Sequence, residues 1–388
     1  MTNKTTDPRR DKPTRTSDDQ GVSAPTWQQI CTRRMDRHGL ITPLPTIETA
    51  VRAMASTHAQ VMSAAEVSIG LRTGVTKDEV QRKLWDDQTL IKMYGLRGTV
   101  HLVPAEDFGR WITALDVVTQ PPNIKGILTA DQTDAVLAAL DAAVADGPRT
   151  MTELDAYVIE ATGSWAADPV MPNFGGSAPR WRHALGTATR RGVICFGPNR
   201  GRNSTYQKAP RVDRTDPGEA VNWLVMAFLH AYGPATPDHF ARWTAGAKSI
   251  AKRAFDAADL DETAFGYVIK GDDTWPDPIV DYVRLLPYFD AYTVGCHPRS
   301  ELFPGAALER AAPGGSAGNF PVILLDGSVV GVWHQRKSGR KIHLTIEPLQ
   351  PLSHSQREQV HDQAQRIAAI VGAEATVAFD SVTVMMHR

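Results

Sequence analysis

Two residues of this chain, His58 and Gln60, have types and spacing that could do chemistry together. A single alanine separates them in the stretch MASTHAQVMS, residues 54–63. An imidazole with an unperturbed pKa of about 6.5 can accept a proton at neutral pH. A carboxamide can hold a water molecule, because its oxygen accepts hydrogen bonds and its nitrogen donates them. Together the two side chains could deliver water to an electrophilic carbon, and general-base help of this kind raises a rate by about 10²- to 10⁴-fold.

The same tripeptide also has a purely structural interpretation. Apolar residues at Ile47, Val51 and Met54 recur at helical spacing, and His58 follows at the end of the predicted helix. His58 could cap that helix by satisfying its last carbonyl groups, while Gln60 faces solvent. If the chain is extended there instead, both side chains can point to one place. The residues alone leave both alternatives open.

Composition limits the classes of protein to consider. The chain has 388 residues, of which 42% are hydrophobic and 22% charged, as is typical of a soluble protein with several compact units. No apolar run approaches the roughly 18 residues of a membrane span. Residues 1–25 carry both signs of charge and lack the apolar core of a signal peptide, so they predict a disordered tail. We expect a cytoplasmic, nucleoid-associated protein with no membrane partner.

The cysteines and histidines give no pattern typical of a metal site. Cys31, Cys195 and Cys296 lie far apart in the sequence and suit a reducing compartment. The twelve histidines include neither a His-Glu-x-x-His motif nor a pair four residues apart. We therefore expect no metal and no other cofactor.

A pattern of three helices followed by a two-stranded ribbon, the plan of a winged helix, occurs three times with little identity between the copies. The final part of the chain is instead rich in strand-like stretches, with turns at Asp326-Gly327 and Ser338-Gly339 and a helix that Ser353 caps. The fold class predicted is α+β, mainly helical, with tandem winged-helix domains and a C-terminal β-rich element. The predicted boundaries are winged helices over 26–125 (with His58 and Gln60), 126–214 (basic) and 215–300, a linker over 301–320 and the β-rich element over 321–388.

The near-zero net charge of −1 hides an asymmetric distribution of basic residues. The segment 169–212 contains no Asp or Glu. Its arginines fall on the third predicted helix of the second unit and on the ribbon after it, where a winged helix presents a surface to DNA. The alternative is a solvated basic face without a ligand. The predicted DNA contacts in this segment are Arg180, Arg182, Arg190, Arg191, Arg200 and Arg202.

A second basic cluster surrounds the tight turn at Ser338-Gly339. Its like charges repel one another unless an anion approaches, and each phosphate that they neutralise would make DNA binding more sensitive to salt. The alternative is a charged edge strand that prevents aggregation. The predicted DNA contacts here are Arg336, Lys337, Arg340 and Lys341, and Arg97 on the first predicted ribbon turn is a further one.

Three stretches, in this order, resemble motifs of the winged-helix DNA glycosylases of the AlkZ and YcaQ superfamily. YGLRGTVHLVPAEDFGRW resembles an Arg-Gly-Thr-x-His-x-Val/Ile motif, RLLPYFDAYTVGCHPR a Leu-Leu-Pro-x-Phe-Asp motif, and GVWHQRKSGRKIHLTIEP a tryptophan followed by a basic hairpin. The resemblance covers roughly residues 27–385. The first motif is fairly specific, and the other two gain weight from their order.

The resemblance implies tandem winged helices in a C-shaped arrangement, with DNA in the concave channel, and excision of alkylated purines. The family's catalytic Gln-x-Gln or Gln-x-Asp motif matches His58-Ala59-Gln60, which makes the chain a His-x-Gln variant. Asp290, in LLPYFD, could stabilise an oxocarbenium ion or support His58, or could be a buried structural carboxylate.

We therefore expect a monofunctional DNA glycosylase, a monomer that acts on double-stranded DNA with alkylated bases. N7-alkylguanine and N3-alkyladenine already carry positive charge and leave readily, so the enzyme needs chiefly to guide water to the anomeric carbon. Bulky genotoxin adducts and interstrand crosslinks are possible substrates. No amine near His58 suggests a lyase step, so the product is an abasic site. The alternative is a non-catalytic winged-helix regulator or damage-binding protein.

Overall fold

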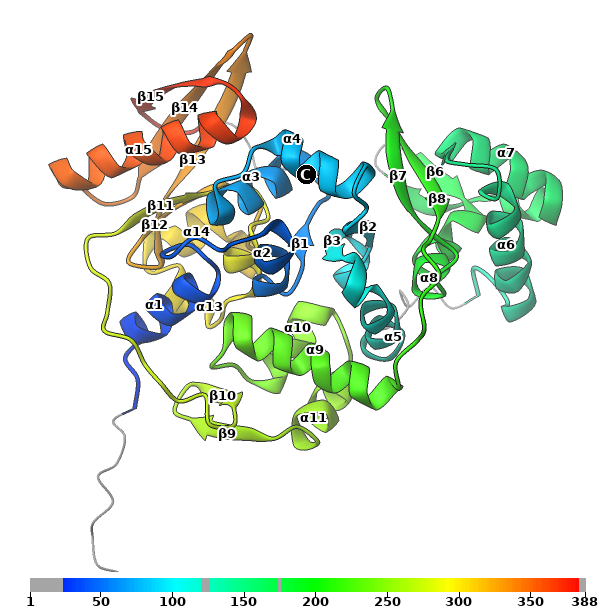
Figure 1. Ribbon diagram of the computed structural model, residues 1–388, viewed down its shortest axis with the longest axis horizontal. Coiled ribbons are helices and arrows are strands. Elements are labelled where there is room, and N and C mark those ends of the chain that lie inside the picture. Colours follow the sequence, from blue (N-terminus) through cyan, green and yellow to red (C-terminus); the bar gives the residue numbers. More distant parts are fainter. Residues whose placement is uncertain (1–23, 120–125, 174–175, 384–388) are drawn as a thin grey trace, which may run out of the picture.

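Three consecutive segments of the chain repeat one topology in the computed structural model, which describes residues 24–119, 126–173 and 176–383 (Figure 1). Each segment contains a helix, a short strand (a single bridge residue in the third), two further helices and a two-stranded ribbon. The short strand pairs with the second strand of the ribbon in all three. This order of elements is that of a winged helix, so the predicted fold class is confirmed. Most of the predicted disordered tail, residues 1–23, lies outside the described residues.

The first unit carries His58 on its short strand. The helix over Lys77–Trp85 starts with a capping box, in which Glu79 accepts hydrogen bonds from the backbone and the hydroxyl of Thr76 at 2.8 and 2.9 Å. The sheet has the order β1-β3-β2. The elements are α1 (Trp27–Arg37), α2 (Ile47–Ala53), β1 (Thr57–His58), α3 (Met62–Thr73), α4 (Lys77–Trp85), β2 (Leu90–Tyr94), β3 (Val100–Pro104) and α5 (Phe108–Val118).

The second unit has the equivalent sheet, in the order β4-β8-β7, and an inserted hairpin between its second and third helices. Its third helix, α8, contacts α5 and β2 of the first unit. The helix that we expected to meet DNA is therefore partly covered by the protein itself. The elements are α6 (Ala130–Ala143), β4 (Arg149–Thr150), α7 (Met151–Thr162), β5 (Pro169–Asn173), β6 (Gly176–Pro179), α8 (Leu185–Arg190), β7 (Ile194–Arg200) and β8 (Asn203–Lys208).

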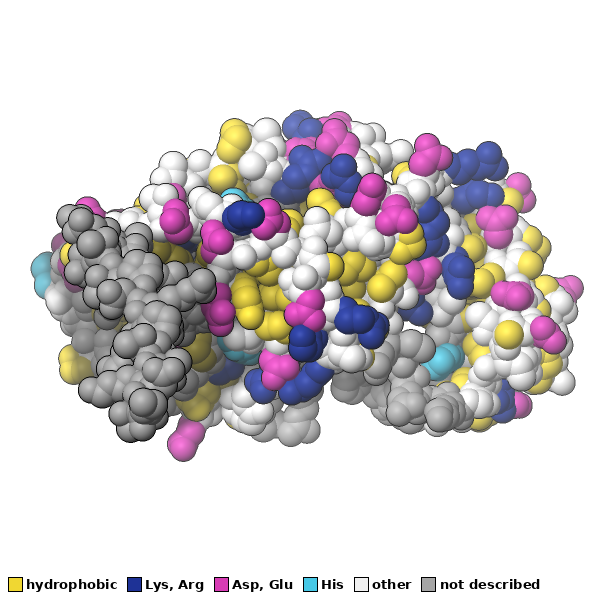
Figure 2. Space-filling model, turned by 90° about the horizontal axis from the view of Figure 1, so that it is seen from below, with side chains coloured by type: hydrophobic (Ala, Val, Ile, Leu, Met, Phe, Trp, Pro, Cys, Tyr) yellow, Lys and Arg dark blue, Asp and Glu magenta, His cyan; other side chains and the backbone are white. Residues whose placement is uncertain are grey.

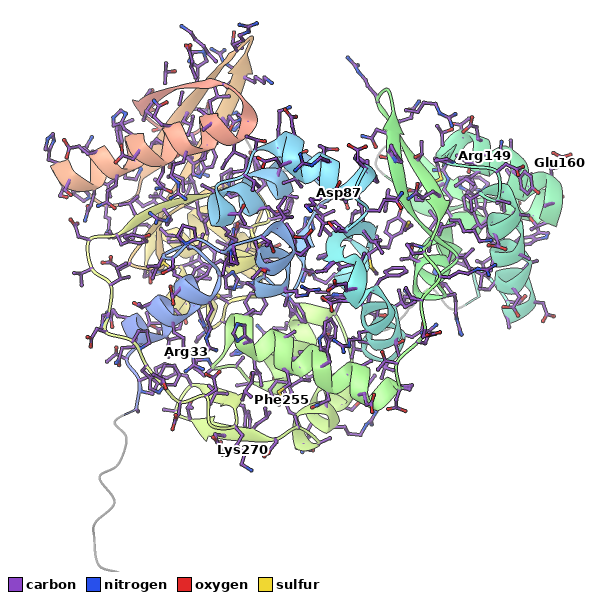
Figure 3. All side chains as sticks on the ribbon, viewed as in Figure 1. Arg33, Asp87, Arg149, Glu160, Phe255 and Lys270 are labelled. Atoms are coloured by element: carbon purple, nitrogen blue, oxygen red, sulfur yellow. The ribbon has the colours of Figure 1, made fainter. Side chains whose placement is uncertain are left out.

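The third unit reduces the short strand to a single bridge between Ala235 and Tyr267. Its elements are α9 (Pro217–Tyr232), α10 (Pro237–Thr244), α11 (Lys248–Asp256), β9 (Leu260–Thr263) and β10 (Gly266–Ile269). Helix α1 holds this unit to the first, because Arg33 donates hydrogen bonds to the carbonyls of Asp272 and Thr274 and lies 4.3 Å from the ring of Trp275 (Figure 3).

The C-terminal part is a five-stranded sheet in the order β11-β12-β13-β14-β15, in which only β14 and β15 run parallel. Strand β11 comes from within the range predicted for the third unit. Helix α15 packs on the sheet and against α3 of the first unit. The elements are β11 (Val283–Leu286), β12 (Val322–Leu325), β13 (Ser328–Ser338), β14 (Lys341–Pro348), α15 (His354–Val371) and β15 (Glu374–Phe379).

The segment predicted as a linker, residues 301–320, is partly helical. It includes the second half of α13 (Arg299–Leu302) and all of α14 (Ala306–Ala311), and it follows the short helix α12 (Ala291–Gly295). Ala307 and Ala311 are buried, and α14 packs on β13. The flanking prolines and glycines suggested a loop, but the small apolar residues between them form a helix that covers the sheet.

Two hydrophobic cores meet at the sheet of the first unit. Met93 belongs to the core shared with the third unit and the C-terminal sheet, which also contains Phe228 and Val332. Leu102 belongs to the core shared with the second unit, which also contains Trp181. The first unit thus contributes to both cores and connects the second unit to the rest of the molecule. In Figure 1 the hairpins β7–β8 and β13–β14 project to the same side, with α4 between them, as the predicted C-shaped arrangement requires.

Candidate active site

His58 lies in a strand and not at the end of a helix. After α2, Ala55 and Ser56 adopt left-handed backbone conformations, with φ of 50° and 109°, which turn the chain away from the helical path. Strand β1 then pairs antiparallel with β3, so that His58 stands opposite His101. The alternative in which His58 caps the preceding helix is therefore excluded, because Met54 is the residue at that cap.

Two aromatic rings fix the imidazole of His58. The ring of Phe289 is stacked on it, with centroids 4.6 Å apart and planes at 25°. The ring of His101 meets it edge-on, with centroids 5.2 Å apart and planes at 72°. Phe289 itself has a left-handed backbone, φ 54°, which its N–H stabilises by donating to the carbonyl of Gly318 at 2.8 Å. These contacts leave the His58 side chain 8% exposed and restrict its orientation.

His101 is a neutral imidazole of known tautomer. Its Nδ1 lies 3.1 Å from the carbonyl oxygen of Thr99, which can only accept, so Nδ1 carries the proton and Nε2 does not. Burial, and then the proximity of His58 and Arg97, hold the pKa of His101 well below its ordinary value. The motif contained this residue, but its contact with His58 depends on strand pairing that the sequence did not reveal.

Gln60 is exposed, and its carboxamide is tied to the same sheet. Its Oε1 accepts a hydrogen bond from the backbone N–H of Val100 at 3.3 Å. A carboxamide oxygen has a second lone pair, and the Nε2 amide carries two N–H donors. Gln60 is therefore oriented by the protein and keeps groups that can bind a water molecule. Strand β1 ends at His58, and Gln60 lies two residues further on, in a bend at the surface.

Asp290 is a fully buried carboxylate that holds the Phe289 loop on α3. It accepts two hydrogen bonds from the Arg72 guanidinium at 2.8 and 2.9 Å and one from the Ser68 hydroxyl at 2.7 Å. Burial alone would raise the pKa of Asp290, but these partners and the backbone N–H of Tyr292 outweigh burial and lower it. These contacts favour the interpretation of Asp290 as a buried structural carboxylate. Its influence on His58 is indirect, because its neighbour Phe289 is stacked on the imidazole.

Most of the predicted DNA contacts in the second unit have acidic partners within the protein. Arg180 pairs with Asp168 at 2.9 Å, and Arg182 pairs with Asp155. The remaining pairs are Arg190 with Asp116 at 3.6 Å and Arg200 with Glu153 at 2.7 Å. Arg191 and Arg202 are exposed. Ion pairing reduces the positive charge that this face offers to a phosphate, and the role of all six in DNA binding stays a prediction.

The basic cluster of the β13–β14 hairpin is exposed, and no ion pair involves it among the described residues. Its members are Arg336, Lys337, Arg340 and Lys341. Arg97, in contrast, turns inward and donates a hydrogen bond from its guanidinium to the carbonyl of Trp243 at 2.8 Å. On the face seen in Figure 2, from the side opposite to the two hairpins, Lys and Arg alternate with Asp and Glu.

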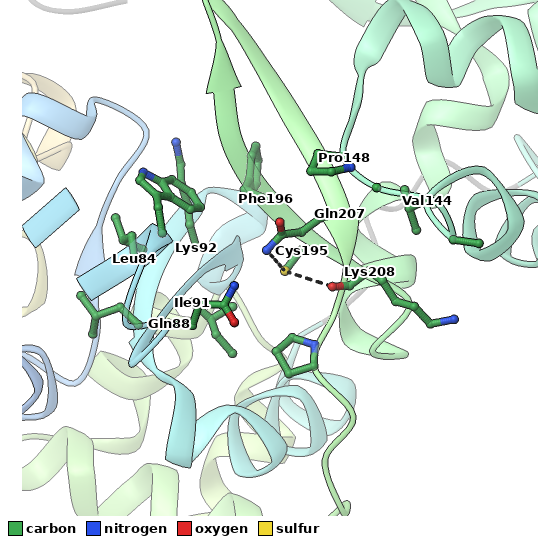
Figure 4. A pocket seen from close by; sticks show the side chains of 15 residues that line it. Leu84, Gln88, Ile91, Lys92, Val144, Pro148, Cys195, Phe196, Gln207 and Lys208 are labelled. Atoms are coloured by element: carbon green, nitrogen blue, oxygen red, sulfur yellow. Dashed lines mark hydrogen bonds between the residues drawn. The ribbon is translucent and has the colours of Figure 1, made fainter. Parts of the chain in front are cut away.

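A pocket of about 390 Å³ separates the first and second units, away from the predicted catalytic pair (Figure 4). Lys92 lines it, with its ammonium group 5.1 Å from the ring centroid of Phe196. Lys92 follows the alternation of β2, in which Met93 pairs with His101, so its side chain faces away from the side that carries His101. A second pocket, of about 190 Å³, is lined by Val61 and Tyr288, the neighbours of Gln60 and Phe289.

Comparison with known proteins identifies the family of the chain. The model of a family described as DNA glycosylase AlkZ-like matches residues 51–370. The chain belongs to this family. The resemblance seen in the sequence is thus confirmed, and this AlkZ-like protein is a DNA glycosylase with DNA as its partner.

A curated relative of the AlkZ-like protein is the interstrand DNA cross-link repair glycosylase of Streptomyces sahachiroi. The two are 28% identical over 338 residues, which are 79% of this chain and 87% of the relative. The solved structure of the Streptomyces sahachiroi DNA glycosylase AlkZ matches with a TM-score of 0.74 at 23% identity, over 92% of this chain and 100% of that one. This structural match supports the assignment of the fold. Within the residues described here, no helix has both the length and the apolar character needed to cross a membrane.

Proposed function

We propose that the AlkZ-like protein is a monofunctional glycosylase that removes alkylated purines from double-stranded DNA by directing water to the anomeric carbon. The observation that carries the proposal is the placement of His58, fixed between two rings beside an oriented carboxamide. The protein acts as a monomer, and the exposed basic hairpin binds phosphates next to the lesion.

The reaction asks little of an acid, because an N7- or N3-alkylated purine already carries positive charge and departs as a neutral base. As the glycosidic bond lengthens, the sugar gains oxocarbenium character, and a water molecule must be ready on the opposite face. Gln60 orients that water through its free lone pair and its amide N–H groups. His58 accepts the proton as the oxygen–carbon bond forms. The products are the free base and an abasic site.

Phe289 and His101 are positioning residues in this scheme. Their rings hold the His58 imidazole in one orientation, so less freedom is lost when water and substrate are bound. Because His101 stays neutral, it adds no competing positive charge beside the developing oxocarbenium ion.

A lyase step would need an amine that attacks the sugar to form a Schiff base. Lys92, the lysine of the sheet that carries the site, faces away from it. We therefore propose hydrolysis without strand cleavage.

The test is a duplex with a single N7-methylguanine, incubated with the protein and analysed before and after heating in alkali. After heating in alkali, we expect more strand breaks in the modified duplex that was incubated with the protein than in the same duplex without protein, and none in an undamaged duplex. Breaks without alkali would show a lyase and contradict the monofunctional scheme. Absence of breaks in both cases would leave a protein that binds damage without excising this lesion.

A further inference from the structure

An apolar pocket opens beside the catalytic pair. It has a volume of about 190 Å³ and lies between the start of α3, the loop before Phe289, and strand β13. Its walls include Ala64, Tyr288, Trp333 and Val371. None of the residues that line it is Asp, Glu, Lys, Arg or His. We refer to it as the α3–β13 pocket.

Two residues that line the α3–β13 pocket are direct neighbours in the sequence of residues of the candidate active site. Val61 follows Gln60 directly, and Tyr288 precedes Phe289, the ring that is stacked on His58. The opposite wall is β13, the strand that continues into the basic hairpin. A lesion bound between His58 and the hairpin would therefore lie close to this pocket.

The walls are fixed before any ligand arrives. The Nε1–H of Trp333 donates to the carbonyl of Leu286 at 3.0 Å, so the indole has its polar atom satisfied and is held in place. Trp333 is 2% exposed. Helices α3 and α15, which supply Ala64 and Val371, pack against each other. A rigid apolar pocket binds an apolar group without a large cost of ordering its walls.

The residues that line the pocket suit a substituent on the damaged purine better than the purine base itself. A purine turned into a pocket needs hydrogen-bond partners along its Watson–Crick edge. Here, polar side chains are few: Ser63, Gln335 and the phenol of Tyr288. An apolar ring needs no such partners, and a cavity of about 150 Å³ is known to hold benzene. The aromatic face of Tyr288 also attracts the positive charge that alkylation places on the purine.

We propose that the α3–β13 pocket receives the alkyl substituent of the damaged purine, and that it favours substituents that are apolar and about the size of one aromatic ring. The proposal rests on the proposed function. It assigns the choice among adducts to this pocket, and the chemical step to His58 and Gln60.

The test compares two duplexes, one with N7-methylguanine and one with N7-benzylguanine, in single-turnover excision and in competition binding by fluorescence anisotropy. Two variants fill the pocket from opposite walls, Ala64→Leu on α3 and Val371→Phe at the end of α15. The matched control is Ala227→Leu, which fills another pocket of about 190 Å³ between α2, α5 and α9. Thermal unfolding of all three variants verifies that each one is folded.

We expect each filling variant to lower excision of N7-benzylguanine at least about tenfold while N7-methylguanine stays within about threefold, because a blocked pocket excludes the ring but not the methyl group. Affinity for the benzyl duplex should fall in parallel, and Ala227→Leu should change neither lesion. Equal losses on both lesions, or no loss on the benzyl lesion in either variant, would overturn the proposal. If the wild type excises neither lesion, the proposed function fails, and the anisotropy measurement alone then decides whether the pocket recognises the ring.

Discussion

The imidazole of His58 and the ring of Phe289 lie stacked, with their centroids 4.6 Å apart. The contact joins two segments that are far apart in the sequence. The short strand of the first winged helix carries His58, the proposed base, and the loop before α12 carries the ring that is stacked on it. Asp290 fastens that loop to α3 through Arg72, so a buried ion pair supports the geometry of the site.

Replacing Phe289 by leucine tests whether this stacking matters for the reaction. We expect Phe289→Leu to lower single-turnover excision of N7-methylguanine about tenfold to a hundredfold, because a small displacement of a catalytic group has effects of this size. Affinity for undamaged duplex should be unchanged. The matched control is Phe255→Leu in the core of the third unit, which should lower stability and leave the rate unchanged. A normal rate in Phe289→Leu would show that the ring does not position His58.

Removal of the Asp290 carboxylate should destabilise the whole protein. Asp290→Ala leaves the Arg72 guanidinium buried without its counter-charge, which typically costs about 3–5 kcal/mol. Urea unfolding measures the loss. Asp238→Ala, which breaks an exposed ion pair with Lys248, should change little. An unfolding free energy for Asp290→Ala close to that of the wild type would refute a structural role for the carboxylate.

The pH dependence of stability should contain a contribution from His38. Burial, and then the positive charge of Arg72, lower the pKa of this histidine to about 3. In the unfolded chain its pKa is about 6.5, so between these values only the unfolded state binds the proton. The free energy of unfolding therefore falls as pH decreases below about 6.5, by about 1.4 kcal/mol per pH unit.

The variant His38→Asn isolates this contribution. Between pH 7 and pH 5, the wild type should lose about 2 kcal/mol more than the variant in urea unfolding. The difference between the two pH values cancels the change that the substitution itself makes to packing. Parallel losses in the two proteins would mean that His38 takes up its proton in the folded state as readily as in the unfolded one.

The salt dependence of DNA binding should separate the hairpin from the paired arginines of the second unit. Arg336→Gln with Lys337→Gln should reduce the slope of log affinity against log salt by about 2, since each phosphate contact contributes about 0.9. Arg180→Gln with Arg182→Gln should change the slope less, because both side chains pair with Asp168 and Asp155. Lys252→Gln on α11 serves as a control. Equal slopes for the hairpin variant and the wild type would show that the hairpin does not contact the DNA phosphates.

Features determined by nearby residues were predictable from the sequence. The helix cap at Ser353 depends on a hydroxyl side chain directly before the helix, and the turn at Asp326 and Gly327 depends on backbone conformations that these residue types favour. Both were correctly predicted. The recurrence of one helix–ribbon pattern in the sequence likewise indicated tandem winged helices.

Features that depend on distant partners were not predictable. The contacts of His58 with His101 and Phe289 arise from strand pairing and from docking of the C-terminal sheet. The acid-free segment 169–212 suggested free positive charge, yet Asp155 and Glu153, from a helix outside it, neutralise Arg182 and Arg200. A count of charges along the chain cannot reveal such pairing across space.

The most direct test of the account is single-turnover excision of N7-methylguanine by the wild type, His58→Ala and Gln60→Ala, with affinity for undamaged duplex measured in parallel. His354→Ala, which removes an exposed histidine from the start of α15, is the matched control. We predict that each of the first two variants loses at least about tenfold in rate, binds DNA as the wild type does, and that the control keeps its rate. Full activity in both His58→Ala and Gln60→Ala would contradict the assignment of the chemistry to this pair.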